Sequence, residues 1–177
     1  MSAKRKGRRQ IAQQTTLLVV GEGPDDKAFI SHMKQLFCPR GCGVSVKVEA
    51  QDGGSPGNII SNAIRSYASP DYNQRFLLLD ADVPPSAVEY KRARAAGYEI
   101  ILWRPQCLEG ALLEALDERV QAHETSQQLK ARLHPRLAGR HTEPAAYAEL
   151  FTRQVLDAER NAAVAELRQI LLGQRRP

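Results

Sequence analysis

The stretch that decides the fold, residues 17–26, reads Leu-Leu-Val-Val-Gly-Glu-Gly-Pro-Asp-Asp. Its continuous apolar run predicts a strand that is covered on both faces, as in parallel sheets. The chain then turns and presents Glu22 and Asp26 directly after the strand. The same design recurs in Phe-Leu-Leu-Leu-Asp-Ala-Asp, where Asp80 and Asp82 follow the apolar run. The sequence therefore predicts two buried strands that both end in carboxylates.

Carboxylates at the ends of such strands point into the crevice where open α/β sheets bind their ligands. Several carboxylates at one crevice repel each other, and a pair at ~4 Å costs about 4 kcal/mol at an effective dielectric of ~20. A divalent cation removes that cost, and oxygen ligands suit Mg²⁺. The pattern therefore predicts a site for Mg²⁺ (or Mn²⁺) that acts on phosphate oxygens.

The order of the remaining elements predicts the fold class. Strands are expected at 15–20, 44–48, 76–80 and 100–103, with helices between them at 25–37, after the loop at 52–57, and from Pro84-Pro85 to about Ala96. This alternation predicts an α/β fold with a four-stranded parallel sheet and flanking helices. The strict apolar–polar alternation of 44–48 predicts a half-exposed edge strand. After Leu108 the pattern is helical, with a mobile segment expected at 119–141 and a helix from Glu143-Pro144.

Length and charge indicate three parts in the 177-residue chain: a basic arm (1–14), an α/β domain (15–118) and a C-terminal helical extension (119–177). The arm carries five cations, and without them the 20 basic and 20 acidic residues of the chain balance. We interpret it as a disordered segment that contacts nucleic-acid phosphates. A solubilising terminus is the alternative. The five cations are Lys4, Arg5, Lys6, Arg8 and Arg9.

The sequence also bears on where the protein is located in the cell. No apolar run approaches the ~20 residues that span a membrane. The basic N-terminus lacks the apolar region of a secretory signal, so we expect cytoplasmic localisation and no membrane partner. The three cysteines give no disulfide framework.

With Glu22-Gly23-x-x-Asp26 and Asp80-x-Asp82 after two buried strands, residues 15 to about 104 resemble the TOPRIM domain. That domain occurs in topoisomerases, primases, small RNA-maturing nucleases and OLD-type nucleases. The loop Gly-Gly-Ser-Pro-Gly-Asn-Ile-Ile (53–60) and Arg-Pro-Gln-Cys-Leu-Glu (104–109) are similar to the small RloB-like branch of OLD-type proteins, often associated with phage defence.

The chain departs from the family pattern at four positions. Gly21 stands where the family usually has valine, and Pro84 stands where a third acid would be. Arg104 and Leu108 differ from the Asn-Pro-Cys-Phe-Glu-like signature of the RloB-like branch. These departures leave the subfamily and the number of metal ions open.

The resemblance implies a role for each acid. Glu22 would be the general acid/base, or a metal ligand in a two-metal version of the site. Asp80 and Asp82 would hold Mg²⁺, and Asp26 would support that site. Glu109 is expected to complete the acidic site in place of the acid that Pro84 displaces; the alternative is that it only complements a helix dipole. The implied function is a Mg²⁺-dependent nuclease that cleaves DNA or RNA, in phage defence or nucleic-acid processing.

Two other functions remain open. One is a catalytically silent TOPRIM-like subunit that binds nucleic acid or a protein partner. OLD-type nucleases often work with an ATPase, and because this chain has no Gly-x-x-x-x-Gly-Lys-Ser/Thr loop, an ATPase would be a separate chain. The other, ranked lower, is a receiver-like domain in which Asp80 is phosphorylated. Such domains have a fifth strand ending in Lys-Pro, and no suitable Lys-Pro is present.

Overall fold

The computed structural model describes residues 14–174 and has one four-stranded sheet. Its strands are β1 (Thr15–Gly21), β2 (Val44–Ala50), β3 (Gln74–Asp80) and β4 (Tyr98–Trp103). All neighbouring strands pair in parallel, in the order β2-β1-β3-β4. The predicted fold class is confirmed, and β2 lies at the sheet edge, as its alternating sequence predicted.

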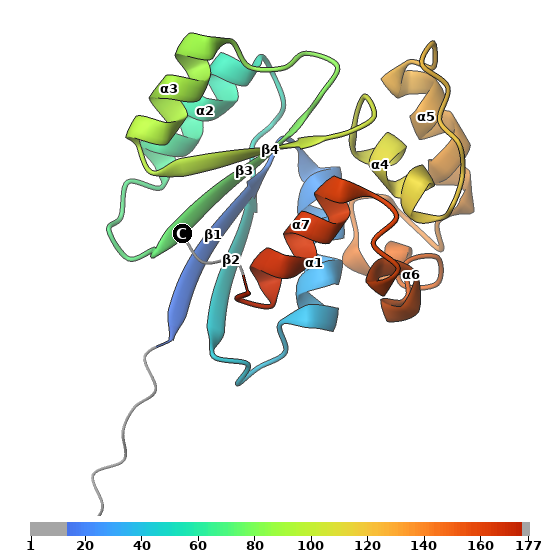
Figure 1. Cartoon of the computed structure of the whole chain (residues 1–177), viewed down its shortest axis with the longest axis horizontal. Helices are drawn as coiled ribbons and strands as arrows, with labels where there is room; N and C mark the ends of the chain where they lie inside the picture. Colours follow the sequence, from blue (N-terminus) through green and yellow to red (C-terminus); the bar gives the residue numbers. More distant parts are fainter. Residues whose placement is uncertain (1–13, 175–177) are drawn as a thin grey trace, which may run out of the picture.

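Helices cover both faces of the sheet and make up the C-terminal part of the described chain. Figure 1 shows α2 and α3 on one face and α1 and α7 on the other. The helices are α1 (Pro24–Phe37), α2 (Pro56–Ser66), α3 (Ala87–Ala95), α4 (Leu108–Ala115), α5 (Ser126–Leu133), η1 (His134–Arg136), η2 (Pro144–Tyr147), α6 (Arg153–Asp157) and α7 (Ala162–Leu171), where η marks a 3₁₀ helix.

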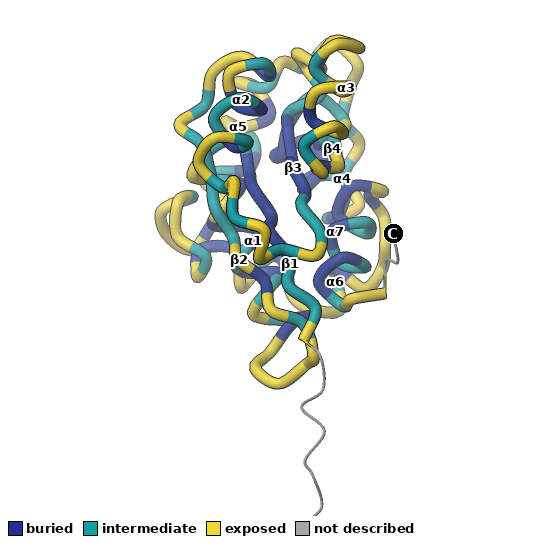
Figure 2. The backbone as a smooth tube through the Cα atoms, turned by 90° about the vertical axis from the view of Figure 1, so that its left-hand side faces the viewer, coloured by how far each residue is buried: buried dark blue, intermediate teal, exposed yellow. Residues whose placement is uncertain are grey.

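The apolar run of β1 serves two separate cores because its side chains alternate between the two faces of the sheet. Leu17 and Val19 pack in the core that contains Phe29 of α1. Leu18 and Val20 pack in the core formed with α2 and α3. Figure 2 shows the resulting distribution, with buried strands inside and exposed helix surfaces outside. A central strand that is covered on both faces must be apolar throughout, as the sequence of β1 is.

The helices that follow β1 and β3 lie on opposite faces of the sheet, although these two strands are neighbours. When the connections from two neighbouring strands run to opposite faces of a sheet, a crevice forms at the carboxyl ends of these strands. Open α/β sheets bind their ligands in such a crevice. Glu22 follows β1 and Asp80 ends β3, so the topology brings both acids to this crevice.

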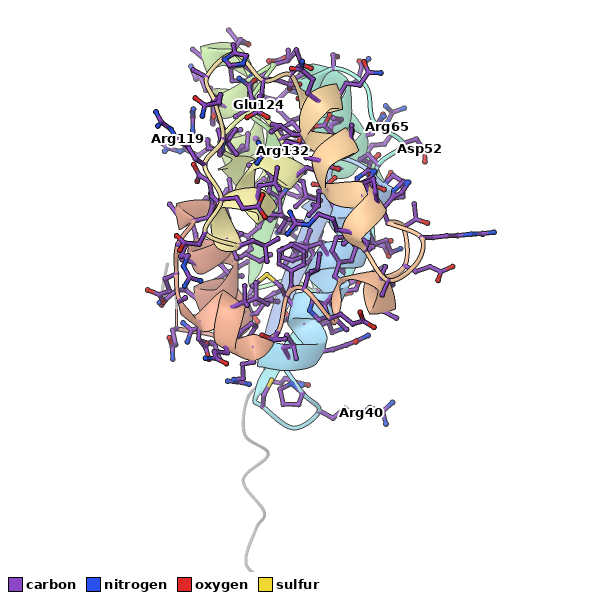
Figure 3. All side chains as sticks on the ribbon, turned by 90° about the vertical axis from the view of Figure 1, so that its right-hand side faces the viewer. Arg40, Asp52, Arg65, Arg119, Glu124 and Arg132 are labelled. Carbon is purple, nitrogen blue, oxygen red and sulfur yellow. The ribbon has the colours of Figure 1, made fainter. Side chains whose placement is uncertain are left out.

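The segment 119–141, expected to be mobile, is instead folded. Leu129 and Leu133 of α5 are fully buried. Arg132 donates to Glu124 at 2.7 Å and also bonds Glu118. Figure 3 shows Arg132 and Glu124 together beside α5. The prediction was wrong because two leucines four residues apart give little periodicity, and the ion pairs that help to hold the segment leave no apolar pattern.

Two expected helix starts were also wrong. Instead of one helix from Glu143-Pro144, the chain forms a turn of 3₁₀ helix, η2, and then the shorter helices α6 and α7. The side chain of Thr152 accepts a backbone N–H bond at the start of α6, and the side chain of Asn161 accepts two at the start of α7. Each cap therefore marks the beginning of a separate helix. Likewise, α3 begins after Ser86, which forms a capping box with Glu89, rather than at the two prolines.

The C-terminal helices pack on α1. The buried His32 ring nitrogen Nε2 lies 2.7 Å from the carbonyl oxygen of Phe151. Phe29 makes edge contacts with the rings of Tyr147 and Phe151, both with centroids 5.6 Å apart. In the described part of the chain, no helix is both long and apolar enough to cross a membrane. Residues 1–13 of the predicted basic arm (1–14), with all five of its cations, lie outside the described residues.

Candidate functional site

A cavity of about 320 Å³ opens at the carboxyl ends of β1 and β3. Its walls come from the strand ends, from the first turns of α1 and α4, and from α5 and the segment after η1. Most of its charged lining is acidic, with one lysine and one histidine beside the acids. The ionisable lining residues are Glu22, Asp25, Asp26, Asp52, Asp80, Glu109, Lys130 and His141.

Glu22 and Asp80 are linked across the two central strands. The Glu22 Oε2 atom accepts a hydrogen bond of 3.0 Å from the backbone N–H of Asp80. Asp80 Oδ1 in turn accepts one of 3.1 Å from the backbone N–H of Leu108, in the first turn of α4. One oxygen of each carboxylate is therefore fixed by backbone, which holds both side chains at the cavity.

Asp26 is buried and supports this arrangement. Its Oδ1 accepts a 2.6 Å bond from the indole Nε1 of Trp103, and its Oδ2 accepts a 3.1 Å bond from the backbone N–H of Gly23. Burial raises the pKa of Asp26 to about 7, against the opposing effect of these two bonds. Because both oxygens already accept bonds, Asp26 is better placed to orient the Glu22 turn than to bind an ion.

Gly21 is required by the approach of α1 to the end of β1. A Cβ atom at Gly21 would lie 2.3 Å from the Cβ of Asp26, far inside contact distance. A valine, as usual in the resembled family, would therefore displace Asp26. The departure at Gly21 follows from this close packing.

Asp82 lies beside the cavity rather than in its wall. Its side chain is exposed; Oδ2 accepts a 2.7 Å bond from Ser126 Oγ, and Oδ1 accepts a 2.8 Å bond from the Val83 backbone. The negative charge of Asp82 still contributes to the raised pKa of Glu22. Its turn is tied to the β4–α4 loop, because the Gln106 carbonyl accepts bonds from two backbone N–H groups of this turn.

Glu109 lies in the first turn of α4 and lines the same cavity as Glu22 and Asp80. It is 2% exposed, and its Oε1 lies 2.8 Å from His134 Nε2. Burial on its own would raise the pKa of Glu109, but the bond to His134 and the charge of Lys130 outweigh it, so the pKa is lowered. The predicted placement of Glu109 in the acidic crevice agrees with this geometry, while its role as a metal ligand stays a prediction.

The acids raise each other's pKa values. Burial, followed by the charges of Asp26, Glu22 and Glu109, raises the pKa of Asp80 to about 8. The pKa of Glu22 is also raised, chiefly by burial. Such shifts mark negative charge that is not fully compensated by the protein, and a cation at this cavity would reverse them.

Five residues of the site were not assigned to it from the sequence: Asp25, Asp52, Lys130, His134 and His141. Lys130 lines the cavity from α5. Asp25 Oδ1 lies 2.7 Å from His141 Nδ1, and the rings of His134 and His141 stack with centroids 4.2 Å apart. The two histidines are seven residues apart in a polar segment, so no short-spaced ligand motif revealed them. Only the folding of 119–141 over the strand ends brings them to the crevice.

Asp25, His134 and His141 are the one set of three metal-binding residue types, within residues 14–174, whose ligand atoms all lie within 4.8 Å of one another. The predicted Mg²⁺ ligands do not form such a set. Mg²⁺ keeps several waters and is held by one or two carboxylates together with substrate phosphates. Glu22 and Asp80 supply two carboxylates at one cavity, and their binding of Mg²⁺ stays a prediction.

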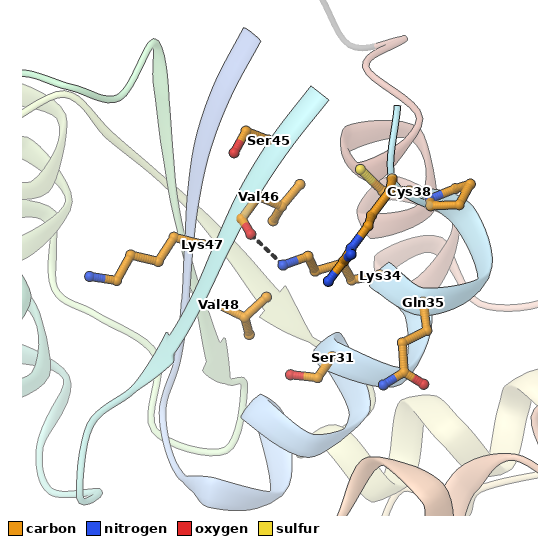
Figure 4. A pocket seen from close by; sticks show the side chains of 10 residues that line it. Ser31, Lys34, Gln35, Cys38, Ser45, Val46, Lys47 and Val48 are labelled. Carbon is orange, nitrogen blue, oxygen red and sulfur yellow. Dashed lines mark hydrogen bonds between the residues drawn. The ribbon is translucent and has the colours of Figure 1, made fainter. Parts of the chain in front are cut away.

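A second hollow, of about 720 Å³, lies between α1 and β2 and is drawn in Figure 4. Lys34 crosses it and donates a 2.6 Å bond to the Val46 carbonyl. Its lining residues include Lys34, Arg40 and Lys47 but no carboxylate. This hollow therefore lacks the acidic groups that line the strand-end cavity.

Comparisons with protein-family models, with curated proteins and with solved structures found no match for this chain. The functional argument therefore depends on the geometry of the strand-end cavity. No relative contributes a substrate or a residue role to it.

Proposed function

We propose that this chain is a TOPRIM-like, Mg²⁺-dependent nuclease that cleaves phosphodiester bonds in DNA or RNA. The observation that carries the proposal is the link between Glu22 and Asp80. Two acids from neighbouring parallel strands are fixed by backbone N–H groups at one cavity. Their raised pKa values indicate a place where a cation would be stabilised.

Asp80 would hold the ion, with Asp82 at the rim acting directly or through water. Glu22 would be a ligand in a two-metal site and the general acid/base in a one-metal site. A bound Mg²⁺ supplies Lewis-acid stabilisation of the negative charge that develops on the phosphate oxygens. Glu109 reaches the same cavity from α4 and is the candidate for a further ligand. Hard oxygen donors of this kind match the preference of Mg²⁺.

In hydrolysis, the oxygen of a water molecule forms a bond to phosphorus while the bond from phosphorus to the leaving oxygen breaks. In a one-metal site Glu22 is the candidate general acid/base, because its carboxylate is held at the cavity beside Asp80. As base it takes the proton from the attacking water, and as acid it returns a proton to the leaving oxygen. The bond from the Asp80 N–H holds the carboxylate in position for this transfer.

Lys130 is the one cation among the residues that line the described cavity, apart from the ionisable His141. The charges of Glu109 and Asp80 raise its pKa, against the opposing effect of burial. A lysine in this position fits a phosphate of the substrate backbone as a point charge. The predicted contacts of the basic arm with nucleic acid would extend this binding outside the cavity.

The proposal is tested by incubating the full chain with Mg²⁺ or Mn²⁺ and single- and double-stranded DNA and RNA. We expect cleavage that Asp80→Asn lowers by orders of magnitude. Asp117→Asn is the matched control, because Asp117 is exposed, lies outside the cavity and has a positive φ that asparagine tolerates. Absence of cleavage of all four substrates would count against the nuclease.

That outcome would favour the second candidate, a catalytically silent subunit that binds nucleic acid or a protein partner. One observation supports it: within residues 14–174, the predicted carboxylate ligands do not converge as closely as the Asp25 cluster. The receiver-like alternative is weakened because the described residues form four strands, without a fifth. A separate ATPase partner, a role in phage defence and cytoplasmic localisation belong to the nuclease proposal as further expectations.

A further inference from the structure

We infer that Asp25, His134 and His141 form a binding site for a first-row transition-metal ion such as Zn²⁺, next to the carboxylates proposed for Mg²⁺. The inference goes beyond the proposed function, because it concerns a different ion held by different residues. It depends on side-chain geometry and donor type.

The three side chains already converge on one point. His141 Nδ1 lies 2.7 Å and His134 Nε2 lies 3.9 Å from the carboxylate oxygens of Asp25. Ligand atoms ~2.1 Å from a tetrahedral ion are roughly 3.4 Å apart, so small side-chain movements would suffice. An ion would shorten the distance between His134 and Asp25. It would also replace the hydrogen bonds that His134 Nε2 makes with Glu109 and His141 Nδ1 makes with Asp25.

The protein holds these groups from several directions. Asp25 is in the first turn of α1, and His134 begins η1 at the end of α5. The backbone of His141 is fixed because the buried Tyr147 hydroxyl donates a 2.6 Å bond to the His141 carbonyl. Ligands held in this way lose little conformational freedom when an ion binds, which favours affinity.

The donor types select the ion. Two imidazoles and one carboxylate suit Zn²⁺ and its neighbours in the first transition row, whereas Mg²⁺ and Ca²⁺ prefer oxygen ligands alone. Three protein ligands leave a fourth position for water or substrate, as in catalytic zinc sites. Glu109 contacts His134 at 2.8 Å and its charge acts on Asp80, so it lies between this site and the carboxylate site.

Titration of the full, chelator-treated chain with Co²⁺ and Zn²⁺, followed by visible absorption and calorimetry, tests the inference. We expect one Co²⁺ to bind with imidazole coordination and Zn²⁺ to displace it. His134→Gln and His141→Asn retain a donor for Glu109 and Asp25 but remove the imidazole nitrogens. Each should weaken binding at least tenfold.

Two control variants locate the binding. His123→Asn changes an exposed histidine outside the cluster and should bind as the unmodified chain does. Cys42→Ser removes half of the Cys38–Cys42 pair, whose sulfur atoms lie 2.9 Å apart and could compete for the ion. It should also leave binding unchanged. Unaltered affinity in both cluster variants, or loss in Cys42→Ser, would overturn the inference.

Asp80→Asn separates this inference from the proposed function. It should abolish cleavage and leave Co²⁺ binding within a few-fold of the unmodified chain. Histidine-dependent Co²⁺ binding by a chain that cleaves no substrate would support the site and count against the nuclease. Co²⁺ binding that disappears with Asp80→Asn and persists in the histidine variants would assign the ion to the carboxylates and overturn the inference.

Discussion

The Oε2 atom of Glu22 lies 3.0 Å from the backbone nitrogen of Asp80, so the last residue of β3 positions the acid that follows β1. Asp80 is itself positioned by the first turn of α4 through Leu108. Three segments far apart in sequence are thus joined in one hydrogen-bonded chain at the cavity. A substitution that shifts the backbone of any of these three segments should therefore move the carboxylates of Glu22 and Asp80.

The first prediction concerns the pH dependence of stability. An aspartate titrates near pH ~3.9 in an unfolded chain, whereas the pKa of Asp80 in the fold is about 8. The folded state therefore binds the extra proton between these values. Asp80 therefore contributes to the free energy of unfolding fully below pH ~4, and this contribution is lost as the pH rises to 8. The metal-free chain should become less stable over this range.

Asp80→Asn cannot ionise at this position, so its melting temperature should fall less steeply between pH 5 and 8. The fall should not vanish, because burial also raises the pKa of Asp26 to about 7. The measurement is thermal unfolding in chelator, followed by the fluorescence of Trp103. Added Mg²⁺ should stabilise the unmodified chain at pH 8 more than the variant. Identical pH profiles for the two proteins would contradict the prediction.

Gly21→Ala should destabilise the fold. The new Cβ would lie 2.3 Å from the Cβ of Asp26, so the first turn of α1 must shift and the bond from Trp103 to Asp26 should weaken. Overpacking of this kind costs about 1–3 kcal/mol. Urea unfolding should show a lower midpoint, and the Trp103 emission of the folded state should change.

Gly23→Ala provides the matched control for Gly21→Ala. A Cβ there would meet only Asp26 Oδ2, at 3.9 Å, and the backbone is extended. Its unfolding midpoint should stay close to that of the unmodified chain. An equal loss in both variants would show that the close approach at Gly21 is not the cause.

The strands and their order along the chain could be predicted because each carries a local pattern. Buried β1 and β3 are apolar throughout, and the edge strand β2 alternates. Glu22 and Asp80 could be assigned to one crevice for the same reason, since both follow buried parallel strands. Each of these inferences needs only residues that are close together in sequence.

The second half of the site could not be predicted in this way. Lys130 and His141 line the cavity, and His134 contacts Glu109 beside it. This part of the chain is held by α5, which packs on α4 and buries Leu129 and Leu133, and two apolar residues are a weak signal. The caps that break the C-terminal part into short helices, such as Asn161, are single residues that an apolar-spacing argument overlooks. Tertiary packing, rather than local periodicity, places this segment over the strand ends.

The N-terminal arm should add salt-sensitive affinity for nucleic acid. Each phosphate contact contributes ~0.9 to the slope of log affinity against log salt on duplex DNA, so five cations would contribute up to about 4.5. Deleting residues 1–10 should flatten that slope, measured by fluorescence anisotropy, and leave the cleavage rate of saturated enzyme unchanged. An unaltered slope would identify the arm as a solubilising terminus.

Lys130→Met should weaken substrate binding, because the cavity would lose its lysine while the side chain keeps a similar length. Hydrogen bonds to charged groups contribute about 1.5–3 kcal/mol, so the loss should be roughly 10- to 100-fold in kcat/KM. Lys130→Arg retains the charge and should recover part of the activity. Lys91→Met, on the exposed surface of α3, is the control and should behave as the unmodified chain. If Lys130→Met also keeps full kcat/KM in cleavage assays with Mg²⁺, then Lys130 does not contact the substrate phosphate.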